Sequence, residues 1–355
     1  MAWSSPYAYV AGQTVTAANL NTYLSANLQY LYDNRFGVGR RNAIINSHFD
    51  VWQRGTSFTV ASSTKTYCAD RWAVYRAATG CSVSRISGPT GQPYSMWIKR
   101  DSGNSATTLI YAYQALESID TYRFAGQDAY LKLTMHAGAN FSAASSAILV
   151  RVIYGTGTDE SPDTTWAGQT EALSTSQVIT TTPTSYDFGP IAIPSSATQI
   201  KVVLSFTPVG TAGAADGFAI SAAQLSVDPA PGYERLPYAE TLALCQRYYW
   251  QWGPGLTTGA VLHTGANWSG TAGIGALRFP VTMRTTPTIT FSAGNDFRVE
   301  ANSATYNTTA IVAACVTPTG ARIDTTTSGM TAGQANWVSN TQDPANAAMC
   351  VDAEL

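Results

Sequence analysis

The sequence has little charge and no concentration of charge of one sign. Asp, Glu, Lys and Arg make up 12% of its 355 residues and the formal net charge is −2, whereas an ordinary soluble domain carries about 25% charged residues. Without a run of Lys or Arg, the basic surface that nucleic-acid binding needs is missing. We therefore expect no nucleic-acid partner and a neutral, hydroxyl-rich surface.

Long apolar runs and targeting segments are missing too. No apolar stretch reaches the roughly 18–20 residues of a membrane span. The N-terminal MAWSSPYAYVAG lacks the basic start and apolar core of a signal peptide. These absences predict a protein that is made in the cytoplasm, without membrane insertion or conventional secretion.

Cysteine and histidine are too scattered for the usual metal and catalytic motifs. The odd number of cysteines and the lack of CxxC spacing predict buried free thiols rather than a disulfide framework or a zinc site. The histidines fit neither HExxH nor a nucleophile triad, so we expect surface or strand positions for them. These residues are Cys68, Cys81, Cys245, Cys315 and Cys350, and His48, His136 and His263.

Carboxylates give only weak support for catalysis. A pair of them could hydrolyse a glycosidic bond, but the repeats typical of polysaccharide-cutting spikes are not visible. We therefore predict that the protein is not an enzyme. The candidates by residue type alone are Asp50, Asp70, Asp159, Glu160 and Asp163.

One amphipathic helix is predicted near the N-terminus, over residues 17–34. Thr16 can serve as its N-cap and Gly37 follows as a stop. Four leucines fall on one face, which must pack on something. They are Leu20, Leu24, Leu28 and Leu31. Residues 1–40 form the predicted N-terminal segment.

From residue 41 onward the hydrophobic period changes to two, which indicates half-buried strands. AYLKLTMHA and IKVVLSFT show the alternation most clearly, and IINSHFDVW, RWAVYRA, YSMWIKR, TLIYAYQAL, AILVRVIYG and GFAISAAQLSV read likewise. Eight or nine such strands separated by turn clusters predict a jelly-roll-like antiparallel β-sandwich over residues 41–232.

A short helix is predicted at residues 233–252, after the break at DPAPG. Its larger side chains are spaced 4, 3, 4 and 3, which is a two-heptad seam. Such a short seam must be held by the flanking domains or by copies of itself. The seam residues are Tyr238, Leu242, Cys245, Tyr249 and Trp252. Short strands after it predict a second, smaller β-sandwich domain over residues 253–355.

Two motifs resemble the ends of a β-sandwich module found in bacteriophage fibre proteins. NAIINSHFDVWQRGTSF followed by YCADRW resembles its start, and ERLPYAETLALCQRYYW resembles the segment that closes it. AGQTVTAANLNTYLSANLQYL is similar to the leader of such fibres, and RFPVTMRTTPTITFS with the ending VDAEL is similar to their distal domain. Leu236 and Thr241 depart from the charged residues usual at these positions, which leaves ionic contacts there in doubt.

The resemblance implies a virion structural protein, a homotrimeric tail fibre or receptor-binding protein that contacts host-surface polysaccharide. Residues 1–40 would attach it to other virion proteins on the tail or another external appendage. The alternatives are a head fibre, collar or capsid-decoration protein with a structural role, and, less favoured, a polysaccharide depolymerase.

Aromatic residues supply the candidates for glycan contact, because sugar rings stack on exposed aromatic faces. Trp52 and Trp72 lie in the WQRG and DRW motifs, where core packing is expected, with Arg54 paired to Asp70 or Arg71 as an internal anchor. The glycan-binding candidates are instead Trp250, Trp252, Trp268 and Trp337.

No cofactor is predicted from a motif. Jelly-roll carbohydrate-binding modules often carry a structural Ca²⁺ near the first and last strands, and this resemblance makes four oxygen-bearing residues weak candidates. They are Asn46, Asp50, Asp216 and Asp228.

Overall fold

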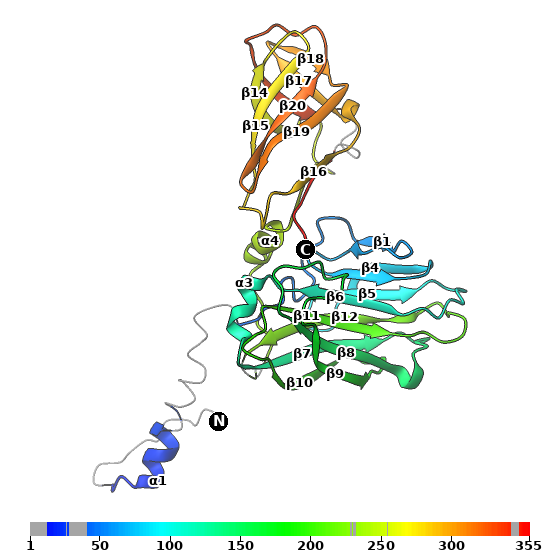
Figure 1. Cartoon of the computed structure of the whole chain (residues 1–355), viewed down its shortest axis with the longest axis vertical. Coiled ribbons are helices and arrows are strands. Elements are labelled where there is room, and N and C mark those ends of the chain that lie inside the picture. The colour runs from blue at the N-terminus through cyan, green and yellow to red at the C-terminus, as the bar shows by residue number, and fades with distance from the viewer. Residues whose placement is uncertain are drawn as a thin grey trace.

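The computed structural model describes residues 13–25, 27, 41–227, 229, 232–253, 255–341 and 348–355. Within them the chain forms a large β-sandwich and a smaller distal β domain that stands on one end of it (Figure 1). Helix α4 (Tyr238–Gln246) and the C-terminal end of the chain lie between the two. The predicted mainly-β fold class is confirmed.

The sandwich consists of two six-stranded antiparallel sheets. The first sheet has the order β1-β4-β5-β12-β7-β10, with bounds Ser57–Thr59, Cys81–Ser87, Tyr94–Arg100, Asp216–Ser226, Asp128–Ala137 and Thr184–Ala192. The second sheet has the order β2-β3-β6-β11-β8-β9, with bounds Thr66–Tyr67, Ala73–Arg76, Ile110–Ala115, Gln199–Phe206, Ala147–Gly155 and Thr170–Val178. Short helices α3 (Ser118–Thr121), η3 (Tyr122–Phe124) and η4 (Ala144–Ser146) connect strands.

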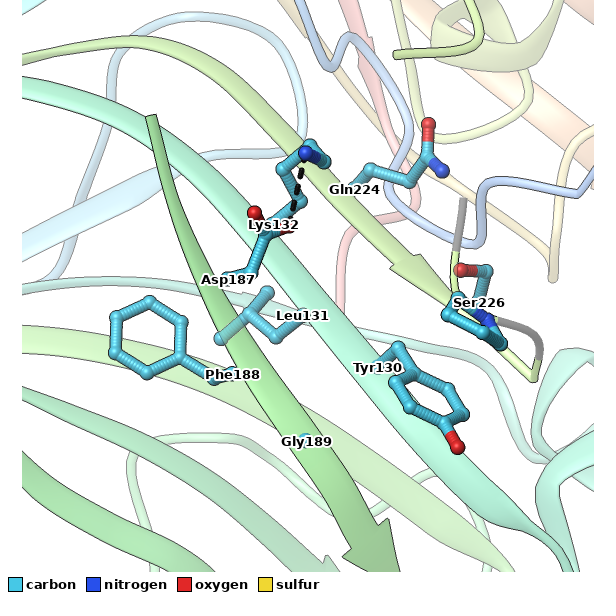
Figure 2. A pocket seen from close by; sticks show the side chains of 9 residues that line it. Tyr130, Leu131, Lys132, Asp187, Phe188, Gly189, Gln224 and Ser226 are labelled. Atoms are coloured by element: carbon cyan, nitrogen blue, oxygen red, sulfur yellow. Dashed lines mark ion pairs between the residues drawn. The ribbon is translucent and has the colours of Figure 1, made fainter. Parts of the chain in front are cut away.

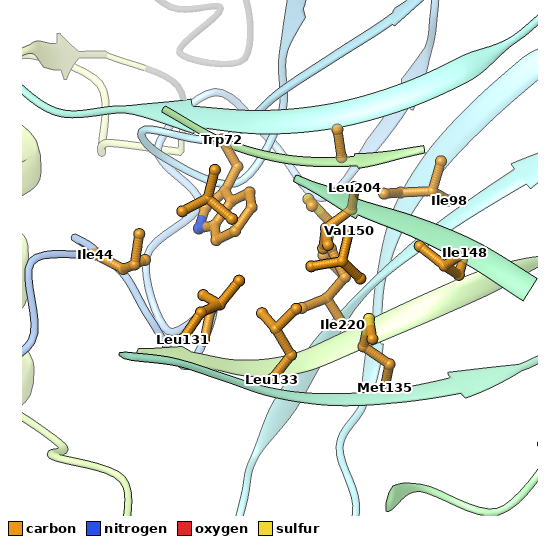
Figure 3. Packing of buried hydrophobic residues seen from close by; sticks show 14 of the residues in the cluster. Ile44, Trp72, Ile98, Leu131, Leu133, Met135, Ile148, Val150, Leu204 and Ile220 are labelled. Carbon is orange, nitrogen blue, oxygen red and sulfur yellow. The ribbon is translucent and has the colours of Figure 1, made fainter. Parts of the chain in front are cut away.

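The core lies between these two sheets, as the alternation of apolar and polar residues along the strands predicts. Leu131, Leu133 and Met135 of β7 and Leu204 of β11 are fully buried, as the period-two pattern predicts. Figure 3 shows them packed with side chains from β5, β8 and β12. Trp72 is also buried there, which confirms its predicted core role. Each fully buried large apolar side chain contributes about 1.5–3 kcal/mol.

The predicted strand IINSHFDVW is wrong, because residues 45–48 form a turn. Asn46 and Phe49 have φ values of 53° and 57°, in the left-handed region. The Asn46 amide closes the loop, since it donates to the Val51 carbonyl oxygen at 2.8 Å and accepts from the Val51 N–H at 3.0 Å. An asparagine tolerates this conformation because its side chain makes such local hydrogen bonds.

The distal domain packs a three-stranded sheet against a seven-stranded one, which is called the large distal sheet below. The three-stranded sheet has the order β13-β22-β16, with bounds Tyr249–Trp252, Met349–Asp352 and Thr288–Phe291. The large distal sheet has the order β18-β17-β21-β14-β15-β20-β19, with bounds Ala304–Asn307, Phe297–Ala301, Ala335–Asn340, Val261–Asn267, Ala272–Arg278, Gly320–Thr326 and Ala310–Thr317. Helix η5 spans Gly294–Asp296. Phe297, Ile323 and Met349 are among the fully buried residues between the sheets.

The predicted junction helix is shorter than expected, and its seam is not one helical face. α4 ends at Gln246, and Tyr249 and Trp252 lie in β13, which pairs with β22. Aromatic residues favour β-strands, and here β22 (MCVD) is the partner strand with which Tyr249 and Trp252 pair. Cys245 packs against Ile45 of its own chain rather than toward solvent.

The N-terminal helix is described only in part. α1 (Ala17–Leu20) continues as a π-helical segment, η1 (Asn21–Ser25). The Thr16 hydroxyl accepts from the Asn19 N–H at 3.2 Å, so the predicted N-cap is confirmed. Leu20 and Leu24 are exposed, whereas Leu28, Leu31 and Gly37 lie outside the described residues. No helix in the described ranges is long and apolar enough to cross a membrane.

The last residues of the chain return from the distal domain to the sandwich. Arg71 donates to the Glu354 carboxylate, and Arg54 donates to Asp352 at 3.3 Å. Arg54 also lies 3.7 Å from Asp70, which confirms the predicted anchor pair. These contacts join β22 of one domain to the WQRG and ADRW motifs of the other.

Candidate functional site

A groove lies on the outer side of the first sheet, over strands β7, β10 and β12. Because Leu131 and Leu133 point into the core, alternation turns Tyr130 and Lys132 outward. Gln224 and Ser226 of β12 lie beside them across the sheet (Figure 2). The groove therefore lies on the polar side of β7, and the apolar side of the same strand anchors β7 in the core.

This groove has a volume of about 460 Å³. It forms where β10 leaves regular pairing between Phe188 and Ile191. Gly189, with φ of 142°, lies so close to Tyr130 that an added Cβ would stand 2.7 Å from a ring carbon. The lining residues are Tyr130, Leu131, Lys132, Asp187, Phe188, Gly189, Gln224, Ser226 and Pro229.

The charged groups of the groove neutralise one another. Lys132 and Asp187 face each other across the β7–β10 ladder, and Lys132 Nζ lies 2.8 Å from Asp187 Oδ1. Most of the Asp187 side chain remains exposed. The pair thus offers N–H donors and carboxylate acceptors to a ligand without a net charge.

Tyr233 crosses the same outer side in the middle. Thr134 donates to the Tyr233 hydroxyl at 2.9 Å, and Thr134 also contacts the Ser185 hydroxyl at 2.8 Å. Burial raises the pKa of Tyr233 to about 12, so the hydroxyl is protonated at neutral pH. The outer side next to Lys132 is consequently a chain of uncharged hydroxyl groups.

An aromatic pair lies further along the same outer side of the first sheet. Trp97 of β5 and His136 of β7 stack with their ring centres 6.3 Å apart. Gly138 makes room for the indole, since a Cβ there would stand 2.6 Å from Trp97. Burial lowers the pKa of His136, and its Nδ1 is buried without a hydrogen-bond partner in the described structure. Together the groove and this pair place aromatic faces and neutral donors and acceptors on one outer side of the sheet, which suits a polyhydroxylated ligand.

The four predicted glycan-binding tryptophans divide into two pairs. Trp250 and Trp252 are half-buried and pack against Phe279 and Phe297 of the distal domain, at centroid distances of 6.0 and 6.1 Å, which leaves less of their rings free for a ligand. Trp268 is 74% exposed and Trp337 is 40% exposed, both on the large distal sheet.

The residues of the groove were missed in the sequence. Their signal was present in the outward half of AYLKLTMHA and in the tryptophan of YSMWIKR, which interrupts a strand of alternating polarity. Alternation alone does not show which outward face is hollow, because the bulge at Gly189 and the crossing of Tyr233 arise from contacts between distant segments.

The five candidate carboxylates are engaged in separate structural contacts. Asp50 pairs with Arg235 at 3.2 Å, and Asp70 accepts from Gln53 at 2.6 Å. Each of the others holds a loop by a hydrogen bond: Asp159 to the Ser118 N–H, Glu160 to the Ala167 N–H and Asp163 to the Tyr113 hydroxyl.

Two of the calcium candidates, Asp216 and Asn46, lie near opposite ends of β12. Asp216 begins β12 and is fully buried against Arg100, whose Nε donates to it at 2.7 Å. Asn46 lies near the other end of β12, where the neighbouring Ser47 pairs with Ala223. Asp228 is outside the described residues. Within the described ranges, no group of three or more His, Cys, Asp or Glu side chains could hold a metal ion.

The cysteine prediction holds in part. Cys68, Cys81 and Cys245 are buried free thiols, as expected, but Cys315 is exposed and Cys350 is half-buried. The histidine prediction is wrong for His48, which is buried in the turn at residues 45–48. His136 and His263 lie in strands, as expected.

No protein-family model and no curated protein matches this sequence. Among solved structures, the chain is similar to TmCBM61, described in complex with β-1,4-galactotriose, at 12% identity over 53% of this chain and 100% of that chain, with a TM-score of 0.32. It is similar to the C-terminal family 22 carbohydrate-binding module of Clostridium thermocellum Xyn10B at 16% identity, over 49% and 99% of the two chains, with a TM-score of 0.31. A CBM4 structure matches at 14% identity, over 51% and 97%, with a TM-score of 0.32.

Proposed function

We propose that this protein is a bacteriophage virion structural protein that binds a host-surface glycan through the groove on the first sheet. The observation that carries the binding is the outer side of the first sheet, where the groove with its Lys132–Asp187 pair lies on the same surface as the Tyr233 hydroxyl and the Trp97–His136 pair. The virion role rests on the WQRG, ADRW and LALCQRYY motifs in the order found in fibre proteins.

Binding would need no catalytic step. Sugar C–H faces stack on Tyr130 or Trp97, and ring hydroxyls exchange hydrogen bonds with Lys132 and Asp187. Because the groove carries no net charge, its natural ligand is a neutral polysaccharide. Each site is shallow, so a homotrimer carrying three of them gains strength from simultaneous contacts.

Residues 1–40 are the proposed attachment to other virion proteins, on the tail or another external appendage. A gold-labelled antibody on intact virions tests this placement. Label at the tail tip supports a receptor-binding fibre, whereas label on the head or collar supports the purely structural alternative. Incubation with host polysaccharide, followed by sizing of the products, tests for the depolymerase alternative.

The groove is tested by binding of the purified full chain to an array of neutral gluco-, galacto-, manno- and xylo-oligosaccharides. Tyr130→Ala and Asp187→Asn should each weaken the signal, with a loss of about tenfold for the tyrosine, which corresponds to 1.4 kcal/mol. Tyr122→Ala is the matched control, because Tyr122 is a highly exposed aromatic outside the groove. Equal binding by wild type and Tyr130→Ala would overturn the assignment.

A further inference from the structure

The two exposed tryptophans of the distal domain lie on the same side of one sheet. Trp337 of β21 pairs with Thr264 of β14, and Trp268 follows the last residue of β14. Since a strand rises about 3.3 Å per residue, the four-residue separation between Thr264 and Trp268 places the two tryptophans on the order of 13 Å apart. Thr264 and Ala266 lie on the exposed side between them, so the surface there is flat.

Each tryptophan stands beside an arginine–carboxylate pair. Arg322 donates to Asp324 through Nε and Nη2, both at 2.7 Å. At the other tryptophan, Arg298 Nε donates to Glu300 at 2.9 Å, and Glu300 pairs across the ladder with Trp337. A guanidinium has five N–H donors and a carboxylate has several lone pairs. Each arginine–carboxylate pair can therefore still form hydrogen bonds with the hydroxyl groups of a ligand.

A cavity of about 390 Å³ adjoins Trp268. Its floor is made by Ile274 of β15 and by the Arg322–Asp324 pair, because Ile274 pairs directly with Asp324. The tryptophan is held from below by its turn, in which the Trp268 N–H donates to the Ala272 carbonyl oxygen at 2.8 Å. The cavity is thus lined by the indole of Trp268, the aliphatic side chain of Ile274 and the polar Arg322–Asp324 pair.

We propose that this side of the large distal sheet is a second sugar-binding face, which takes a neutral oligosaccharide across Trp268 and Trp337. Four of the charges on it cancel within two pairs, and Arg278 of β15 is the remaining exposed cation on this side. A single excess positive charge is far from the basic surface that nucleic acid and other polyanions need. Separate aromatic rings can stack on the C–H faces of a sugar chain, and the arginine–carboxylate pairs can hydrogen-bond its hydroxyl groups. This face shares its ligand class with the proposed function but does not depend on the groove.

The experiment uses the full chain carrying Tyr130→Ala, so that binding by the groove is weakened, on the same array of neutral oligosaccharides. Adding Trp268→Ala should reduce the remaining signal by about tenfold or more, and adding Arg322→Ala should also reduce it. Adding Tyr122→Ala, which removes an equally exposed aromatic in the sandwich, should leave it unchanged. Unfolding curves of all variants check that each has folded.

Three results would overturn the proposal. The first is an undiminished signal in the Trp268→Ala variant, and the second is no signal at all once the groove is weakened. The third is a fall in oligomeric mass on Trp268→Ala, measured by light scattering, because the face would then contact another copy of the chain. Loss of binding only in the groove variants would leave the proposed function standing and remove this second site, so the two failures can be told apart.

Discussion

The guanidinium of Arg71 in the sandwich donates a hydrogen bond to the carboxylate of Glu354, two residues beyond the last strand of the distal domain. Both side chains are almost fully buried, at 2% and 4% exposure. Arg71 also donates to the Ala115 carbonyl oxygen at 2.7 Å and lies over the Tyr248 ring. The pair is therefore the buried centre of the contact between the two domains.

Replacing Glu354 by Ala should lower the free energy of unfolding by about 3–5 kcal/mol, because it leaves a buried guanidinium without its counter-charge. Urea denaturation measures the change. The control is Glu171→Ala, since Glu171 pairs with Arg151 on an exposed strand and such pairs contribute about 0–1 kcal/mol. Equal midpoints for the two variants would contradict the assigned role of Glu354.

Chelation of divalent cations should leave the melting temperature of the protein unchanged, because the calcium candidate Asp216 already has a positively charged partner. Arg100 supplies the positive charge next to Asp216, and the Ser142 N–H donates to the same carboxylate at 2.8 Å. Thermal melts with EDTA and with added Ca²⁺ measure this. A drop on chelation that calcium restores would show a metal site elsewhere on the chain. Asp216→Ala should itself cost about 3–5 kcal/mol, because Arg100 is then buried alone.

His48 should make the protein less stable in mild acid. Burial first, and then the nearby Arg235, lower the pKa of His48 to about 4. Between pH 6.5 and 4 the unfolded chain binds a proton that the folded chain does not, so stability is complete above about pH 6.5 and falls toward pH 4, by an amount on the order of 3 kcal/mol. Urea titrations across this window should show a shallower fall for His48→Gln.

Asp70 should act in the opposite direction. Burial raises the pKa of Asp70 to about 6, although Arg54 opposes the shift. The folded chain then holds a proton between about pH 4 and 6 that the unfolded chain has lost, so the contribution of Asp70 to stability declines as pH rises through this range. Asp70→Asn should remove that decline while leaving the slope from His48. If both variants changed the pH profile in the same direction, one of the two assignments would be wrong.

Leu242→Asp should disturb the junction more than the oligomer. Leu242 packs against the Cys245 and Tyr248 cluster of its own chain. The variant should melt at a lower temperature but keep the wild-type mass in light scattering. Tyr238 is 59% exposed at the start of α4, so Tyr238→Ala is the variant that tests contact with another copy. A mass near 37.7 kDa for the wild type would remove the proposed trimer.

Strong alternation was sufficient to predict the central strands, but not the edges or the junction. AYLKLTMHA became β7 with its predicted inward face. β9 and β10, rich in threonine and serine, carry little apolar pattern because they lie at the sheet edges, where few of their side chains are buried. A helix was expected through Trp252, since local spacing cannot reveal that a strand nearly 100 residues later pairs with Tyr249–Trp252.

The candidate sites show the same division between local and distant causes. Trp268 could be selected from the sequence because it lies next to a Gly-containing loop, SGT, in the distal segment. Trp250 and Trp252 looked equivalent, yet pairing with β22 turned them toward Phe279 and Phe297. The groove depends on Tyr233, Asp187 and Tyr130, which come from three separate segments, so a linear pattern could not assemble it.

The chain crosses between the domains twice, once through α4 and once through the returning residues after β22. A force that pulls on the distal domain is therefore shared by one covalent connection, through α4, and by the non-covalent contacts of Arg71, Arg54 and Arg284 with the returning C-terminal residues. Two separated attachment points resist torsion as well as extension. These two attachments should limit rotation of the distal domain relative to the sandwich. Its exposed face would then keep a fixed angle to the groove.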